Sequence, residues 1–357
     1  MVGRGRHEHR TIASEVFVPL WGDGPQGQGG NMNMSLLNVE GLKTHFDLPR
    51  GVLRAVDGVS FTLEAGRTLG VVGESGSGKS VLARSIIGLL PADRTIKAGG
   101  RVEFAGRNLR EVSEQDMRAI RGREIAMIFQ DPMTSLNPVL TIGRQIEQVL
   151  RQHTDLSRAA AAERAVELLA EVGIADPRQR AKEYAFRMSG GMRQRIVIAI
   201  ALACNPKLLI ADEPTTALDV TVQAQILDLL RRLQDAHSMA MVLITHNLGV
   251  VAEMCDDVAV MYAGQIVEHG SVADVLQRPR MRYTQALLES VPRLDSPSHV
   301  RLPVIEGQPP NLITPPAGCR FAARCAHRAA RCETEQPPWR PAGPGHAYAC
   351  WHPVEAV

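Results

Sequence analysis

The stretch Gly73-Glu74-Ser75-Gly76-Ser77-Gly78-Lys79-Ser80 decides the fold, because it spells G-x-x-x-x-G-K-S, the pattern of a phosphate-binding loop. It follows an apolar run at 68–72 whose composition is that of a buried strand. Glycines let the backbone curl so that successive N–H groups point at a polyphosphate, and the helix predicted next adds its positive end. Lys79 is expected to reach the β- and γ-phosphates, and the Ser80 hydroxyl to ligate Mg²⁺.

The composition limits the classes of protein that this chain can be. Its 357 residues suffice for one large domain or two ordinary ones, and 45% apolar with 22% charged residues is typical of globular proteins. A net charge of +2 gives no reason to expect a nucleic-acid partner. No apolar run approaches the roughly 18 residues of a membrane span. Charged residues interrupt the first 30 residues, so no signal peptide is predicted.

Residues 1–34 are predicted to be a flexible leader, because they end in a stretch rich in glycine. Met32 and Met34 directly precede the first strand-like segment. Translation is expected to begin at one of them, and the alternative is a genuine disordered extension.

Strand-like and helical segments alternate along the rest of the chain. The region 36–61 predicts a small antiparallel element, and 99–104 an edge hairpin. Further strands are predicted at 125–129, 208–211 and 241–244, and helical periodicity covers about 142–185. This alternation predicts an α/β fold with a mostly parallel sheet and functional residues at the strand ends. The shift to Pro, Arg, His and Cys after about 292 predicts a separate C-terminal module.

Two acidic residues, Asp212 and Glu213, end the predicted strand at 208–211. Beside a phosphate loop, Asp212 could hold Mg²⁺ through water together with Ser80. Glu213 could polarise an attacking water as the general base. The alternative is an acidic strand end that is merely solvated.

The segment Ser189-Gly190-Gly191 opens a second predicted helix and could bind an anion through its exposed N–H groups. A helix cap without a ligand is the alternative. The order of motifs along the chain bears on this choice: phosphate loop, Gln130, Ser-Gly-Gly, Asp-Glu, Ala217-Leu218-Asp219 and His246. That series resembles the series found in ATP-binding cassette (ABC) ATPases over residues 36–270.

The resemblance implies roles for residues beyond the phosphate loop. Those enzymes pair head to tail, so each ATP lies between one chain's phosphate loop and the partner's Ser-Gly-Gly helix. Gln130 would sense Mg²⁺ and the attacking water, and His246 would hydrogen-bond the γ-phosphate, unless it is an ordinary polar group at a strand end. Asp219 would lie at the dimer interface. Phe46 is the candidate for stacking on adenine, with a core phenylalanine as the alternative.

Several segments resemble one subfamily, the ATP-binding subunits of oligopeptide, dipeptide and nickel importers: 131–138, 141–146, 188–195 and 283–288. Met188 and Met192 depart from the commonest ABC signature, and the change at Met192 occurs in this subfamily. The resemblance implies an ABC domain at 35–291 with a helical subdomain at about 131–188. It implies a C-terminal extension at 292–357.

The expected function is ATP hydrolysis that powers the import of peptides or a related small solute at the cytoplasmic face of the membrane. The implied partners are a second, distinct ABC ATPase, two permeases and a solute-binding protein. One alternative is a cassette ATPase acting on DNA or ribosomes, but the long coiled-coil insertions of that class are absent from this sequence. A regulatory subunit that only binds nucleotide is disfavoured, because Lys79, Asp212, Glu213 and His246 are all intact.

Six cysteines divide into two groups. Cys204 and Cys255 lie in apolar, helix-like contexts and are expected to be small buried side chains. The other four lie in the last 40 residues: Cys319, Cys325, Cys332 and Cys350. Clustered thiols in a cytosolic protein suggest a metal site rather than disulfides.

The spacing of the four cysteines leaves three alternatives. They are separated by five, six and seventeen residues, without the tight C-x-x-C pairs usual in zinc sites. A [4Fe–4S] cluster tolerates loose spacing, and peptide-importer ATPases with a similar tail hold one. Zinc is the second alternative, with His327, His346 or His352 as substitute ligands, and no metal is the third.

Overall fold

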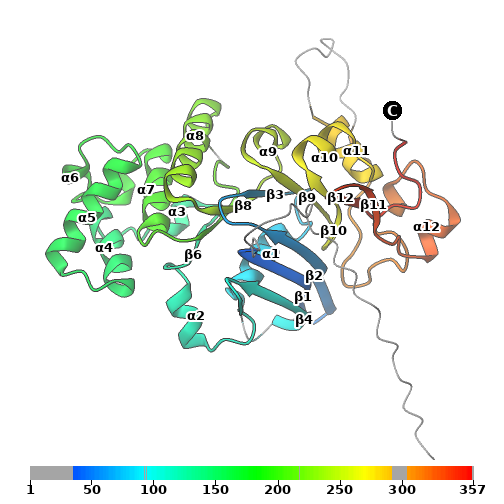
Figure 1. The fold of residues 1–357 in the computed structure, drawn as a ribbon, viewed down its shortest axis with the longest axis horizontal. Coiled ribbons are helices and arrows are strands. Elements are labelled where there is room, and N and C mark those ends of the chain that lie inside the picture. The colour runs from blue at the N-terminus through cyan, green and yellow to red at the C-terminus, as the bar shows by residue number, and fades with distance from the viewer. Residues whose placement is uncertain (1–34, 92, 94, 217, 292–303, 356–357) are drawn as a thin grey trace, which may run out of the picture.

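The computed structural model describes residues 35–91, 93, 95–216, 218–291 and 304–355, which form two sheets with helices packed around them (Figure 1). The predicted leader at 1–34 lies outside the described residues, as do Ala217 and the segment 292–303 that begins the predicted C-terminal extension.

The smaller sheet has four antiparallel strands in the order β2-β1-β4-β5. Its strands are β1 (Leu37–Leu48), β2 (Gly51–Leu63), β4 (Thr95–Phe104) and β5 (Arg107–Asn108). The antiparallel element predicted at 36–61 is confirmed as the β1–β2 hairpin. Strand β4 pairs with β1 on one side and with the edge strand β5 on the other.

The larger sheet has eight strands in the order β11-β12-β10-β9-β3-β8-β7-β6. Five run parallel: β3 (Thr68–Val72), β6 (Ile125–Ile128), β7 (Leu208–Asp212), β8 (Ala240–Ile244) and β9 (Asp257–Tyr262). Strands β3, β7 and β8 are buried at every residue, which is why each reads as a continuous apolar run. Their carboxyl ends lie at one edge, where the phosphate loop follows β3.

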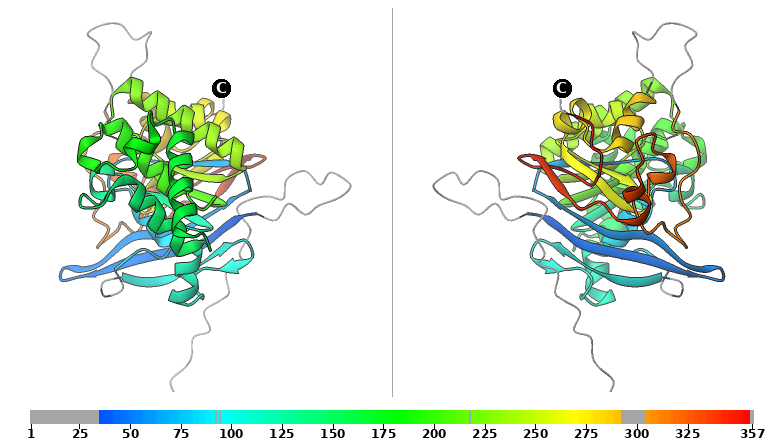
Figure 2. Two further views of the ribbon diagram at one scale, coloured as in Figure 1. Left: turned by 90° about the vertical axis from the view of Figure 1, so that its left-hand side faces the viewer. Right: turned by 90° about the vertical axis from the view of Figure 1, so that its right-hand side faces the viewer.

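Helix α1 (Lys79–Ile86) lies between the two sheets (Figures 1 and 2). Its Leu82 and Ile86 belong to one core cluster with Leu37 and Phe61 of the small sheet and Val71 of the large one. On its other face, the large sheet packs against three later helices, with which it forms two further core clusters: α7 (Gly190–Leu202), α8 (Val220–His237) and α9 (Leu248–Met254). Helix α1, which directly follows the phosphate loop, therefore packs against both sheets.

The predicted helical block lies beyond β6, at one end of the large sheet (Figure 1). It shares a core with α7, through residues such as Ile146 and Leu169. The serine Ser157 begins its longest helix by accepting a hydrogen bond from the Ala160 N–H, at 3.2 Å. The block contains α3 (Pro132–Ser135), α4 (Ile142–His153), α5 (Arg158–Glu171), α6 (Pro177–Arg180) and a 3₁₀ turn η1 (Ala185–Arg187). Helix α2 (Glu114–Ile120) precedes β6 and packs instead into the core cluster that includes the small sheet.

The C-terminal tail, which the sequence predicts to be a separate module, joins the large sheet in the structure. Strand β12 (His346–Tyr348) pairs antiparallel with β10 (Gln265–Ser271), and β11 (Arg340–Gly343) pairs with β12 at the edge. These tail strands are only four and three residues long, too short to carry a visible periodicity. The remaining elements are α10 (Val272–Gln277), α11 (Arg282–Glu289), the 3₁₀ turn η2 (Ala322–Arg324) and α12 (Ala330–Thr334).

A buried carboxyl group ties this tail strand to the sheet. Glu268 of β10 is fully buried and accepts hydrogen bonds from the backbone N–H groups of Arg280 and Met281, at 2.6 and 3.0 Å. A ring nitrogen of His346, at the start of β12, lies 2.9 Å from the same carboxyl group. Because buried polar groups are costly when unpaired, this contact stabilises the docking of the tail.

His346→Ala is expected to lower the free energy of unfolding by about 1–3 kcal/mol, because it leaves one hydrogen bond of a buried carboxyl group unmade. Urea titration measures the loss as a shift of the unfolding midpoint. His352→Ala is the matched control: that side chain is exposed and its loss should change stability by less than about 0.5 kcal/mol. Equal midpoints for the two variants would contradict the assignment.

Candidate functional site

The phosphate loop is wedged between backbone atoms of both sheets, and two of its glycines are required there. Gly73 has φ 150° and Gly78 has φ 104°, values that side chains rarely allow. A Cβ on Gly73 would lie 2.0 Å from the Met261 carbonyl oxygen, and one on Gly78 2.3 Å from that of Ala55. Helix α1 begins at the next residue, so its positive end faces the loop.

The Lys79 side chain lies inside the loop. Its Nζ donates to the carbonyl oxygens of Gly73 and Glu74, at 2.8 and 2.9 Å, and lies 3.4 Å from Ser77 Oγ. Burial lowers the pKa of Lys79, while the carboxylates of Glu213 and Asp212 act in the opposite direction. The ammonium group is thus held where a polyphosphate cradled by the loop would meet it.

Asp212 and Ser80 form a pair that fits a Mg²⁺ ion. Ser80 Oγ donates to Asp212 Oδ1 at 3.0 Å, and Asp212 is fully buried at the end of β7. Its Oδ2 has no hydrogen-bond partner among the described residues, and burial raises the pKa of this carboxyl group. A buried carboxylate oxygen without a partner, next to a hydroxyl, is the donor set that Mg²⁺ prefers. The ion would neutralise a carboxylate that is otherwise costly to bury.

Glu213 points to a different group of side chains than its neighbour, because its backbone is left-handed with φ 49°. Its Oε2 accepts hydrogen bonds from Gln130 Nε2 at 3.0 Å and Thr216 Oγ1 at 2.8 Å. The other oxygen lies 3.3 Å from His246 Nδ1. Burial alone would raise the pKa of Glu213, but the hydrogen bonds from Thr216 and His246 outweigh it and hold the pKa below its ordinary value. An ionised carboxylate at this place can accept a proton from water.

The phosphate loop opens into a cavity of about 350 Å³. Five of the loop's residues line it, and so do Gln130 and Glu213. Phe46 lines the same cavity from β1, as a base-stacking residue would. The motifs do not single out four apolar residues of this wall, Leu53, Ala55, Val81 and Leu312, or Thr216 as a partner of Glu213. None of these five belongs to a motif, so the sequence holds no signal for them.

The remaining candidate residues lie on a second surface, at the starts of α7 and α8. Ser189 Oγ accepts from the Met192 N–H at 3.3 Å, and Asp219 accepts from the Val222 N–H at 2.9 Å. A Cβ on Gly191 would lie 2.7 Å from a Val222 methyl group, so the two helix starts pack closely. Ser189, Gly190, Gly191 and Asp219 do not line the phosphate-loop cavity of their own chain.

The four tail cysteines interact with one another in the fold. The thiols of Cys325, Cys332 and Cys350 all act electrostatically on Cys319, whose pKa burial raises to about 11. Among the described residues, however, no group of three or more His, Cys, Asp or Glu side chains is arranged to hold a metal ion. The expected four-cysteine metal site is therefore not found as a site for a single ion. Cys204 and Cys255 pack against apolar clusters, as expected.

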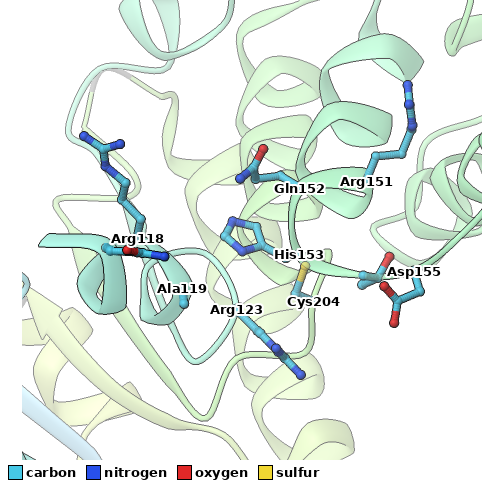
Figure 3. Close-up of a pocket in the computed structure, with 10 residues that line it drawn as sticks. Arg118, Ala119, Arg123, Arg151, Gln152, His153, Asp155 and Cys204 are labelled. Carbon is cyan, nitrogen blue, oxygen red and sulfur yellow. The ribbon is translucent and has the colours of Figure 1, made fainter. Parts of the chain in front are cut away.

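A larger hollow, of about 810 Å³, lies between α2 and the end of α4 (Figure 3). It is lined by Arg118, Arg123, Arg151, His153 and Cys204, and by none of the candidate site residues. The three arginine side chains point away from one another, so they do not converge on one anion. Burial lowers the pKa of His153, and Arg123 adds to this effect. This hollow is separate from the phosphate loop.

Models of two protein families match the chain: "ABC transporter" over residues 56–216, and "Oligopeptide/dipeptide transporter, C-terminal region" over residues 267–332. Among solved structures, the ATP-binding cassette MJ0796, a dimer bound to ADP and phosphate, is similar with a TM-score of 0.59 and 25% identity. That match covers 66% of this chain and 98% of the cassette. The core therefore has the fold of an ABC ATPase.

Curated relatives match the chain over nearly its whole length. The probable peptide ABC transporter ATP-binding protein y4tR of Sinorhizobium fredii is 54% identical, over 90% of this chain and 96% of the relative. The dipeptide transport protein DppD of Bacillus subtilis is 49% identical, over 88% and 94%. The oligopeptide transport protein OppD of Escherichia coli is 49% identical, over 90% and 95%. The chain belongs to the ATP-binding proteins of oligopeptide and dipeptide ABC transporters, a family of ATPases.

Proposed function

We propose that this chain hydrolyses ATP to power the import of peptides through a membrane ABC transporter. The observation that carries the proposal is the sequence identity of 49–54% with peptide-transport ATP-binding proteins, which extends over both the cassette and the tail. The geometry adds support, because the groups that ATP hydrolysis needs line one cavity. The relatives named above are transport proteins, and no observation favours an action on DNA or ribosomes.

In the proposed reaction, the phosphate loop and Lys79 hold the β- and γ-phosphates. Ser80 and Asp212 would hold Mg²⁺, which would supply positive charge that neutralises the phosphates, and Gln130 would sense the ion. Glu213 accepts the proton of the attacking water, which its depressed pKa allows at neutral pH. His246 and Gln130 orient the Glu213 carboxylate through the contacts described above, and His246 can reach a γ-phosphate from its exposed position.

The site is completed by a second cassette. Ser189, Gly190, Gly191 and Asp219 lie on a surface of their own and would serve the ATP bound by a partner chain. ATP favours the closed pair because it contacts both chains only in that state. The partner is proposed to be a related but distinct ATPase, so that the working unit is a heterodimer.

The transporter is proposed to contain two permeases and a solute-binding protein besides the two ATPases. In the described residues, no helix has both the length and the apolar character to cross a bilayer. As a partner of the permeases, the chain would sit peripherally at the cytoplasmic face of the membrane. The helical region at about 131–188 would pass the motion of Gln130 to the permeases.

The four tail cysteines are proposed to hold a [4Fe–4S] cluster. Their thiols act electrostatically on one another, and nearby backbone groups lower the pKa of three of them, Cys319, Cys325 and Cys350, against the effect of burial. Backbone groups that favour the thiolate are typical of iron–sulfur sites, and a cluster of four irons spaces its thiolates more widely than a single ion does. The proposed role of the cluster is structural: it would cross-link segments of the proline-rich tail.

Affinity purification from gently solubilised native membranes tests the transport function. We expect a second cassette ATPase, two multi-spanning proteins and a solute-binding protein to accompany the chain. The binding protein would then identify the solute. Recovery from the soluble fraction alone, or together with nucleic acid or ribosomes, would overturn the proposal while leaving the ATPase chemistry standing.

Glu213→Gln is expected to keep ATP binding and to lower the hydrolysis rate of the assembled transporter roughly 10²–10⁴-fold, because an amide cannot accept the proton. Phosphate release measures turnover, and a fluorescent ATP analogue measures binding. Glu253→Gln, an exposed change on α9, is the control and should leave both unchanged. Undiminished turnover in Glu213→Gln would remove that residue from the role of base.

Cys332→Ser is expected to abolish the brown colour and the iron content of protein purified without oxygen, since Cys332 is buried among the tail thiols. Absorption spectra and iron analysis give the readout. Cys204→Ser, remote from the tail, should leave both unchanged. Wild-type protein that is colourless and free of iron would contradict the proposed cluster.

A further inference from the structure

One residue of the tail, Arg324, reaches the phosphate loop. It ends the short turn η2 and its side chain is only 4% exposed. Its Nη1 donates to Glu74 Oε2 at 2.6 Å and its Nη2 to Glu74 Oε1 at 2.9 Å. This two-pronged pair joins the second residue of the loop to a segment 250 residues later. Such forked pairs combine charge with fixed geometry.

The guanidinium group is held on every side. Nε donates to the Glu306 carbonyl oxygen at 2.9 Å, and Nη2 to that of Ile305 at 3.0 Å. Nη1 also lies 3.3 Å from the Tyr262 hydroxyl. With the two bonds to Glu74, these contacts use all five N–H donors of an arginine. Arg324 therefore has little freedom to move away from the loop.

Glu74 is also held through its backbone. Its N–H donates to the Tyr283 hydroxyl at 2.9 Å, and Tyr283 is fully buried in α11. The Tyr283 ring packs against Tyr262 and Phe321, with centroids 4.5 and 5.4 Å away. Because Phe321 belongs to the tail, both attachments of Glu74 depend on the packing of the C-terminal region.

The charge of Glu74 makes this contact matter for nucleotide binding. Its carboxylate acts electrostatically on the Lys79 ammonium group, so it lies within reach of the charges in the phosphate site. An unpaired carboxylate there would repel a polyphosphate. Pairing with Arg324 offsets that negative charge and holds the Glu74 side chain, which does not line the phosphate-loop cavity.

We propose that Arg324 is a positioning residue of the nucleotide site, which holds and neutralises Glu74 so that the phosphate loop can bind ATP. The proposal rests on the ATPase function given above. It makes the tail part of the nucleotide site. A second tail residue, Leu312, lines the phosphate-loop cavity itself and accepts a hydrogen bond from the Arg54 N–H at 3.1 Å.

The test is a double-mutant cycle on the full-length protein, read by titration with a fluorescent ATP analogue. Arg324→Gln is expected to weaken binding roughly tenfold, because it loosens the loop and leaves the Glu74 charge unpaired. Adding Glu74→Gln removes that charge and should restore affinity to within about threefold of wild type. A role limited to the stability of the tail would give no such rescue.

Arg324→Gln in the assembled transporter should raise the KM for ATP roughly tenfold with little change in kcat, since the removed interaction serves binding. The double variant should return the KM to near its wild-type value. Arg328→Gln is the matched control: it lies four residues further along the tail and is exposed. His346→Ala removes a contact between β12 and β10 but none of the contacts of Arg324 or Glu74, so it should lower stability and leave ATP affinity unchanged.

Three results would overturn the proposal: unchanged affinity in Arg324→Gln, no rescue by Glu74→Gln, or an equal loss of affinity in His346→Ala. If Arg324→Gln does not fold, Arg324→Lys keeps the charge but loses the fork. It should weaken binding roughly threefold, and wild-type affinity in that variant would count against the proposal. Because affinity is measured on the chain alone, this test can fail or succeed whatever proteins accompany the chain in the membrane.

Discussion

The close contact between the phosphate loop and the backbones of both sheets is the constraint on which the rest of the structure depends. Gly73 lies against Met261 of β9, and Gly78 lies against Ala55 of β2. The Gly264 N–H also donates to the Ser77 carbonyl oxygen at 2.8 Å. These contacts place α1 between the sheets and fix the direction in which the loop's N–H groups point. A side chain at Gly73 would push the loop away from β9, and one at Gly78 would push it away from β2.

The geometry at the end of β7 explains how two neighbouring carboxylates take different tasks. Asp212 completes the strand, is fully buried and has one oxygen without a partner, which suits a cation. Glu213 has left-handed backbone and turns toward three hydrogen-bonding side chains. Burial raises the pKa of Asp212. In Glu213 the hydrogen bonds outweigh burial, and the pKa is lowered. A change of backbone direction over one residue would thus separate the ion binding proposed for Asp212 from the proton transfer proposed for Glu213.

The C-terminal region contributes more to the core of the protein than a module attached by a linker would. Its strand β12 extends the large sheet, and its Phe321 packs on Tyr262 and Tyr283 beside the phosphate loop. Two buried arginines, Arg320 and Arg324, pair with Asp57 of the small sheet and Glu74 of the loop. The tail therefore joins both sheets and the nucleotide site, which gives a physical route by which its state could influence ATP binding.

The motifs by themselves determined the phosphate loop, the Asp212-Glu213 strand end and the α/β class, because these depend on short segments whose residue types are dictated by local backbone and by charge. Only the tertiary structure decided that Thr216 contacts Glu213, that Leu312 lines the nucleotide cavity, and that the tail belongs to the large sheet. Each of these depends on segments far apart in the chain, and short strands such as β11 and β12 have no periodic pattern. The pairing of Arg324 with Glu74 is of the same kind: a charged residue at an ordinary position acquires its role only from the residue that the fold places opposite it.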